Sequence, residues 1–182
     1  MSGKRLIFVI IFILSLLYVY LFYTENFKKN QLINHNFERF SFSPPVKTPY
    51  NGFIIRKMNQ FRQSEDYTCG PATARYFLSL SGIHVNEKKL GEIMDTDSYK
   101  GTNLKSIQLA LEKYGLFLKG VKGDISIFKN PCIIQMKYNH FVVFLKKSFY
   151  DDNFFIFDPE FGEVFLFKED FLKLWSGYAL IQ

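Results

Sequence analysis

The 182-residue chain is long enough for one domain with a hydrophobic core, and its hydrophobic content of 48% excludes intrinsic disorder of the main body. Two cysteines over this length exclude the disulfide framework of a small stapled domain. The net charge of +6 is modest and is not gathered into a basic run with interleaved aromatic residues, so no nucleic-acid partner is expected.

The first predicted element is an apolar segment that could cross a membrane. Leu6 to Tyr23 contains 18 residues, in which Ser15 is the only small polar member, and a helix of this length just spans a hydrocarbon core of about 30 Å. Lys4 and Arg5 precede it, as in a signal sequence or a signal anchor. We favour an uncleaved anchor because bulky residues follow where a signal peptidase needs small ones. A buried core helix is disfavoured because no face of the segment is polar.

Positive charges lie on both sides of this segment, so their count does not fix its orientation. A very short basic N-terminus usually stays in the cytoplasm. This predicts a single-pass protein of the cell (inner) membrane with an extracytoplasmic or periplasmic domain. We divide the chain into a membrane anchor over 1–23, a stalk or linker over 24–52, and a folded domain over 53–182. The stalk is polar, contains three prolines and shows no sustained periodicity.

The folded domain begins with helical patterns and continues with strand-like ones. Apolar spacing and capping signals predict helices over residues 71–81, from Asn86, and from Thr102 to Gly115. A last short helix is expected around 169–175. Runs of β-branched or aromatic residues predict strands over 132–136, 141–145, 154–157, 163–167 and 178–181. Helices first and strands later imply an α+β domain in which the helices pack on an antiparallel sheet.

Nucleotide, cofactor and metal sites lack their usual sequence signals. Neither G-x-x-x-x-G-K-[ST] nor G-x-G-x-x-G occurs in the chain. The three histidines, His35, His84 and His140, are scattered, and there is no C-x-x-C pair. We therefore expect no cofactor and no metal.

Cys69 is a candidate nucleophile. It immediately precedes a predicted helix that opens with Gly70 and Pro71, and proline is well suited to a helix's first turn. Unpaired backbone N–H groups and the positive end of the helix dipole then favour the nucleophilic thiolate, and Gly70 leaves room for a carbonyl to approach. A lone cysteine is more often a buried small hydrophobe, so Cys69 by itself does not establish an enzyme.

Three further residues, in the order Gln63, His140 and Asp158, change that balance. Gln63 lies six residues before Cys69, and its amide could form an oxyanion hole with the backbone N–H of Cys69. His140 begins an apolar strand, where a general base can face the start of a helix. Asp158 ends the next strand and can accept the His140 N–H. A packed strand residue and a turn former are the ordinary alternatives for His140 and Asp158, but the whole set is difficult to obtain by accident.

Several segments carry a specific resemblance over roughly residues 58–181. They are Gln63, Cys69-Gly70-Pro71-Ala72, Gly101-Thr102-Asn103-Leu104, Tyr114-Gly115-Leu116, Pro131, His140-Phe141-Val142-Val143, Asp158-Pro159-Glu160-Phe161-Gly162 and Phe171-Leu172-Lys173-Leu174-Trp175-Ser176-Gly177. The chain resembles the double-glycine leader peptidase family, papain-like cysteine peptidases best known as N-terminal domains of bacteriocin-exporting ABC transporters. By this resemblance, Cys69 would be the nucleophile and His140 the general base and acid. Asp158 would orient His140, and Gln63 would be the oxyanion donor.

The resemblance implies a papain-like fold and cleavage after a Gly-Gly pair that ends the leader of a secreted peptide. The expected partners are a peptide or protein substrate, the membrane through the N-terminal helix, and a separate export machinery. Thr68 departs from the transporter-borne members, which usually carry an acidic residue just before the nucleophile. No ATPase or six-span region follows, so we expect a free-standing, membrane-anchored member.

Two other functions stay open. The first is a non-cleaving peptide- or leader-binding module of the same fold, attached to the membrane in a secretion system. It is disfavoured because such degenerate domains are expected to lack the nucleophile. The second is a thiol acyltransferase, in which an amine would capture the acyl-enzyme. We expect Cys132 in the core and Asn139 as a strand-end cap, and we discount a Cys69–Cys132 disulfide because it would abolish the nucleophile.

Overall fold

The computed structural model describes residues 14–21, 24, 46–128, 131–148 and 152–182. The chain divides into two compact units, Met1–Pro44 and Pro45–Gln182. In the first unit, residues 14–21 are helical. The predicted membrane segment over 6–23 lies largely outside the described residues. Within the described residues, no helix has both the length and the apolar character needed to cross a bilayer.

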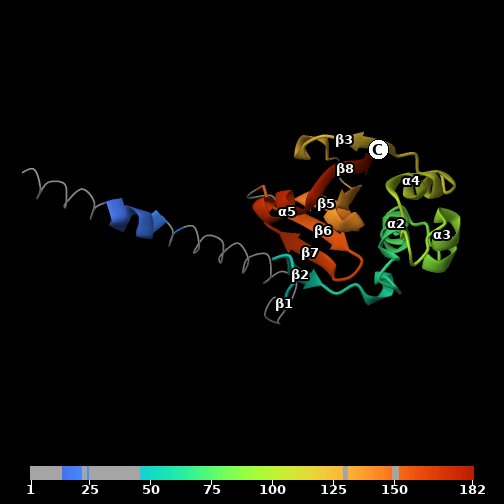
Figure 1. The fold of residues 1–182 in the computed structure, drawn as a ribbon, viewed down its shortest axis with the longest axis horizontal. Coiled ribbons are helices and arrows are strands. Elements are labelled where there is room, and N and C mark those ends of the chain that lie inside the picture. The colour runs from blue at the N-terminus through green and yellow to red at the C-terminus, as the bar shows by residue number, and fades with distance from the viewer. Residues whose placement is uncertain (1–13, 22–23, 25–45, 129–130, 149–151) are drawn as a thin grey trace, which may run out of the picture. The chain divides into compact units, whose positions relative to one another are not determined.

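The second unit is built on an antiparallel sheet of eight described strands (Figure 1). Their spatial order is β1-β2-β7-β6-β5-β4-β8-β3. The strands are β1 (Val46–Lys47), β2 (Phe53–Arg56), β3 (Lys119–Lys122), β4 (Cys132–Met136), β5 (Phe141–Lys147), β6 (Phe154–Asp158), β7 (Gly162–Leu166) and β8 (Trp175–Ile181). The strands predicted in the second half are confirmed, with ends that differ by up to three residues.

The folded unit starts earlier than the predicted boundary at residue 53. Strand β1 pairs with β2, and Val46 and Lys47 lie opposite Ile54 and Phe53. The compact unit therefore includes residues 46–52, which the polar, proline-rich composition had assigned to the linker. A two-residue strand has no detectable periodicity, so its pairing could not be anticipated from its own sequence.

The helices are α2 (Cys69–Ser79), α3 (Glu87–Met94), α4 (Leu104–Glu112) and α5 (Lys168–Leu174), with short 3-10 turns η1 (Asn59–Phe61), η2 (Ile125–Ile127) and η3 (Lys137–Asn139). Figure 1 shows α2, α3 and α4 gathered at one side of the sheet, away from α5. Asn86 caps α3 by accepting a hydrogen bond from Lys88 N at 2.8 Å, and Asn103 caps α4 in the same way. The predicted α+β class, with helices packed on an antiparallel sheet, is confirmed.

The central strands are buried on both faces, which creates two hydrophobic cores. Because successive side chains of a strand point to opposite faces, Phe141 and Val143 join the core under α2, α3 and α4. Val142 and Phe144 join the core that contains Phe171 of α5. Cys69 belongs to the first core and Cys132 to the second, so the sheet separates the two thiols.

Helix α2 is attached to the middle of the sheet by two specific contacts. Thr73 Oγ1 donates a hydrogen bond to Phe141 O of β5 at 2.8 Å. The Tyr76 ring stacks on the Phe157 ring of β6, with 3.8 Å between the centroids and 13° between the planes. These contacts hold the start of α2, and with it Cys69, against the neighbouring ends of β5 and β6.

The turn between β6 and β7 requires Gly162, which has a φ of +96°. Gly162 pairs with Asp158 across the turn. A Cβ at this position would clash with the backbone O of Arg56 and approach Met58 N to 2.9 Å. The close packing of this turn against the chain after β2 fixes the place of Asp158.

Candidate active site

Cys69 is the first residue of α2 and its side chain is almost fully buried, with 7% of the residue exposed. Its Sγ donates a hydrogen bond to Asn139 O at 3.7 Å, and Cys69 is among the groups that raise the pKa of His140. The helix begins at Cys69 itself, not just after it as the sequence predicted. A Cβ on Gly70 would lie 2.6 Å from the Cβ of Thr102, so this glycine is required for packing and its predicted role in admitting a carbonyl is not needed to explain it.

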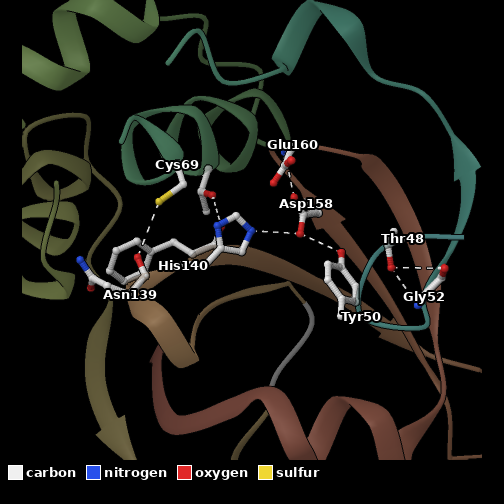
Figure 2. A network of polar contacts seen from close by, with 10 residues as sticks. Thr48, Tyr50, Gly52, Cys69, Asn139, His140, Asp158 and Glu160 are labelled. Atoms are coloured by element: carbon white, nitrogen blue, oxygen red, sulfur yellow. Dashed lines mark hydrogen bonds and ion pairs between the residues drawn. The ribbon is translucent and has the colours of Figure 1, made fainter. Parts of the chain in front are cut away.

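His140 and Asp158 lie at the same edge of the sheet. His140 immediately precedes β5 and Asp158 ends β6, and neighbouring antiparallel strands bring such a start and end together. His140 Nε2 lies 3.0 Å from Asp158 Oδ2, and Asp158 is 1% exposed. Figure 2 shows Cys69 and Asp158 on opposite sides of the imidazole ring. The imidazole ring therefore lies between the Cys69 thiol and the Asp158 carboxylate.

The surroundings of His140 favour its protonated form. Burial alone lowers the pKa of His140, but hydrogen bonds to Asp158 and Cys69, together with the charges of these two groups, outweigh it. The net result raises the pKa of His140 to about 10. An imidazolium at neutral pH can donate a proton to a group that approaches Cys69.

Gln63 lies in the loop that precedes α2, and hydrogen bonds on both sides hold this loop. Gln63 N donates to Pro159 O at 2.8 Å, directly after Asp158. The next residue, Ser64, donates through its N and its Oγ to Glu87 Oε1 at 3.0 and 2.9 Å. Gln63 Oε1 is buried and has no hydrogen-bond partner among the residues that the structure describes. The backbone of this loop is thus fixed beside Asp158.

Asn139 has a larger role than the predicted strand-end cap. It adopts a left-handed conformation, with a φ of +57°, and turns its backbone O toward Cys69. Its side chain donates to Thr102 O at 3.0 Å and accepts from Gln135 Nε2 at 3.1 Å. Asn139 therefore joins the loop before α4 to the connection between β4 and β5, beside the thiol.

The second cysteine, Cys132, lies away from the candidate active site. Cys132 is fully buried in the second core, as predicted, and neither cysteine forms a disulfide. In the described ranges, no group of three or more His, Cys, Asp or Glu side chains could hold a metal ion.

Comparison with known proteins decides the family. Residues 57–182 match the model of the peptidase C39 family. The chain belongs to the peptidase C39 family. This confirms the resemblance to the double-glycine leader peptidases. The matched range contains the four candidate positions, Gln63, Cys69, His140 and Asp158.

Relatives of this C39 chain include both short proteins and parts of transporters. An uncharacterized protein of Methanothermobacter marburgensis is 32% identical over 66% of this chain and 84% of its own length. A lacticin-481/lactococcin-DR transport/processing ATP-binding protein of Lactococcus lactis is 31% identical over 65% of this chain, but over only 18% of its own length. A solved double glycine motif protease from an AMS/PCAT transporter, in complex with the leader peptide, is 26% identical, with a TM-score of 0.61. That match covers 76% of this chain and 97% of the protease.

One residue at the candidate active site was not predicted and lies outside the C39 match. Tyr50 OH donates a hydrogen bond to Asp158 Oδ2 at 2.8 Å, as Figure 2 shows. Tyr50 is in the turn between β1 and β2, a segment assigned to the linker from its composition. The two residues are 108 positions apart in the chain, so no local sequence signal could have revealed the contact.

Proposed function

We propose that this C39 chain is a cysteine peptidase in which Cys69 is the nucleophile, His140 the general acid and base, and Asp158 the residue that orients His140. The observation that carries the proposal is the position of the His140 ring between Cys69 and the buried Asp158, with His140 Nε2 3.0 Å from Asp158 Oδ2. It supports the enzyme over a non-cleaving module because the proposed nucleophile, acid and orienting carboxylate meet where the start of α2 faces the adjoining ends of β5 and β6.

The reaction follows from the positions of these groups. The Cys69 thiolate attacks the scissile carbonyl carbon, and the electron pair moves to the carbonyl oxygen. The N–H of Cys69 and the amide of Gln63 stabilise that oxyanion. The oxyanion collapses, the C–N bond breaks, and the His140 imidazolium gives its proton to the departing amine. Neutral His140 then takes a proton from water, which attacks the thioester and releases the acid together with the regenerated thiolate and imidazolium.

The proposed substrate is a peptide whose leader ends in Gly-Gly, with cleavage after the second glycine. The relative solved with a leader peptide is a double glycine motif protease, and the Lactococcus lactis relative is a transport/processing protein. A nearly buried thiol also favours a slim substrate, since only glycines let a backbone approach without side-chain bulk.

We further propose that the chain is membrane-anchored through residues 6–23 and acts beside a separate export machinery. The unbroken apolar segment and the preceding basic residues support an anchor. The proposed position of the C39 domain is extracytoplasmic, with Lys4 and Arg5 on the cytoplasmic side of the segment. Reporter fusions after Gln182 test the orientation, since alkaline phosphatase fused there is active only outside the cytoplasm.

Incubation of the full-length chain in detergent with synthetic leader peptides tests the peptidase and its specificity. We expect cleavage directly after the second glycine, identified by mass spectrometry. A peptide with leucine in place of that glycine is the matched control and should remain intact. Binding of the leader without any cleavage would support the non-cleaving module and contradict the peptidase. Cleavage of both peptides at equal rates would contradict the Gly-Gly specificity alone.

Gln63→Ala should lower kcat by about a hundredfold with little change in KM, because an oxyanion donor acts on the charge that develops in the transition state. The matched control is Gln60→Ala, which shortens an exposed glutamine close by in sequence. Steady-state kinetics on the Gly-Gly peptide measure the effect. An unchanged kcat for Gln63→Ala would remove Gln63 from the proposed mechanism.

A further inference from the structure

The Asp158 carboxylate accepts hydrogen bonds on both of its oxygens. Oδ1 accepts from Glu160 N at 2.8 Å. Oδ2 accepts from Tyr50 OH at 2.8 Å and lies 3.0 Å from His140 Nε2. The oxygen that faces His140 is therefore the one that Tyr50 also holds. Without Tyr50, the described hydrogen bonds would hold this oxygen through His140 alone, while Glu160 N would hold Oδ1.

Tyr50 is itself placed by a well-bonded turn. Thr48 N donates to Gly52 O at 2.7 Å, and Gly52 N donates to Thr48 Oγ1 at 2.8 Å. The Tyr50 ring packs edge to face against Phe161, with 5.7 Å between centroids. The phenol thus reaches Asp158 from a turn between two paired strands, which holds it as part of the sheet.

The direction of the hydrogen bond is fixed by the chemistry of the two groups. An ionised carboxylate only accepts hydrogen bonds, so the phenol must be the donor. Burial, the charge of Asp158 and the hydrogen bond to it raise the pKa of Tyr50 well above its ordinary value. Tyr50 therefore stays protonated, and remains a donor, throughout the pH range in which a peptidase works.

We propose that Tyr50 is a positioning residue that holds Asp158 Oδ2 toward His140. This inference rests on the proposed peptidase function and extends the machinery beyond the C39 match, to a residue that this chain supplies from its first hairpin. His140 faces Cys69 on α2 and Asp158 on β6, with Tyr50 and Glu160 on the other side of the carboxylate.

The test is Tyr50→Phe in the full-length chain, since phenylalanine keeps the ring against Phe161 and removes only the donor. We expect kcat on the Gly-Gly peptide to fall about tenfold, with KM within about twofold, because the carboxylate loses its orientation and binding is untouched. The pH titration of His140, followed by NMR of its ring protons, should show a midpoint below that of the unmodified chain. A loosened carboxylate stabilises the imidazolium less.

Tyr178→Phe is the matched control, because it removes a hydroxyl from a partly exposed tyrosine of β8 whose cation–π contact with Lys122 needs only the ring. A purely structural role for Tyr50 would lower the melting temperature and leave the His140 midpoint unchanged. A midpoint that stays or rises in Tyr50→Phe, or an unchanged kcat, overturns the inference. The NMR titration needs no substrate, so it tests the role of Tyr50 even if the unmodified chain cleaves no peptide. Absence of cleavage by the unmodified chain would contradict the peptidase proposal instead.

Discussion

Cys69→Ala should abolish cleavage of the Gly-Gly peptide, whereas Cys132→Ala should cleave at the rate of the unmodified chain. Cys69 is the only described cysteine at a helix start and beside an imidazole, and without it no thioester can form. The residual rate should be at least about a thousandfold lower, since removing the nucleophile leaves only binding and oxyanion contacts. Peptide cleavage assayed by chromatography measures both variants.

Alkylation provides an independent measurement for the same prediction. Iodoacetamide should modify Cys69 faster than Cys132, because Cys69 lies at the start of α2 close to His140 whereas Cys132 is fully buried in the second core. Peptide mapping by mass spectrometry distinguishes the two sites. Equal slow alkylation of both cysteines, together with full activity of Cys69→Ala, would contradict the assigned nucleophile.

Asp158→Asn should lower kcat by about a thousandfold, and the alkaline fall of its kcat/KM should begin at a lower pH than in the unmodified chain. The asparagine keeps the size of the side chain but removes the charge that orients and stabilises the His140 imidazolium. In the unmodified chain, where the pKa of His140 is raised to about 10, kcat/KM should fall on the alkaline side as pH rises through that value. Loss of the Asp158 charge and hydrogen bond removes two of the causes that raise this pKa, so the alkaline midpoint should move toward neutral pH.

The same pKa shift connects activity to stability. The pKa of His140 is raised above its ordinary value of 6.5, so protonation of His140 stabilises the folded state. That contribution is complete below about pH 6.5 and is lost as pH rises toward about 10. Urea unfolding across this range should show a decline in the free energy of unfolding that is smaller in Asp158→Asn. The control is Asp152→Asn, an exposed aspartate paired with Lys168, and an equal effect of both variants would contradict the role of Asp158.

The sequence predicted the parts of the fold that carry strong local patterns. Strands β4 to β7 are runs of β-branched and aromatic residues, and the helix starts predicted at Asn86 and Thr102 lie within two residues of the starts of α3 and α4. Strand β3, Lys119–Lys122, was missed because it is an exposed edge strand in which Val121 is the only branched apolar residue. Its strand conformation comes from pairing with β8, which its own four residues do not encode.

At the candidate site, the residues next to a recognisable helix or strand could be predicted, and those placed by contacts distant in the sequence could not. Cys69, His140 and Asp158 each follow or precede a recognisable element, and the structure brings them together as that placement suggested. The position of Asn139 beside the thiol could not be predicted, because its left-handed conformation is accompanied by contacts with Thr102 and Gln135, which come from other parts of the chain. Tyr50 could not be predicted because its partner lies on β6, beyond three α-helices and four strands.

The order of the strands matters for any shortened form of this protein. Strand β2 pairs along β7, whose residues are all buried, and Arg56 of β2 forms an ion pair with Glu163. A fragment cut to the C39 match at residue 57 would keep Gln63, Cys69, His140 and Asp158 but lose β2. Strand β7 would then present unpaired N–H and C=O groups and apolar side chains at an open edge, a surface on which other chains can add strands and aggregate. A soluble fragment should therefore begin before Val46.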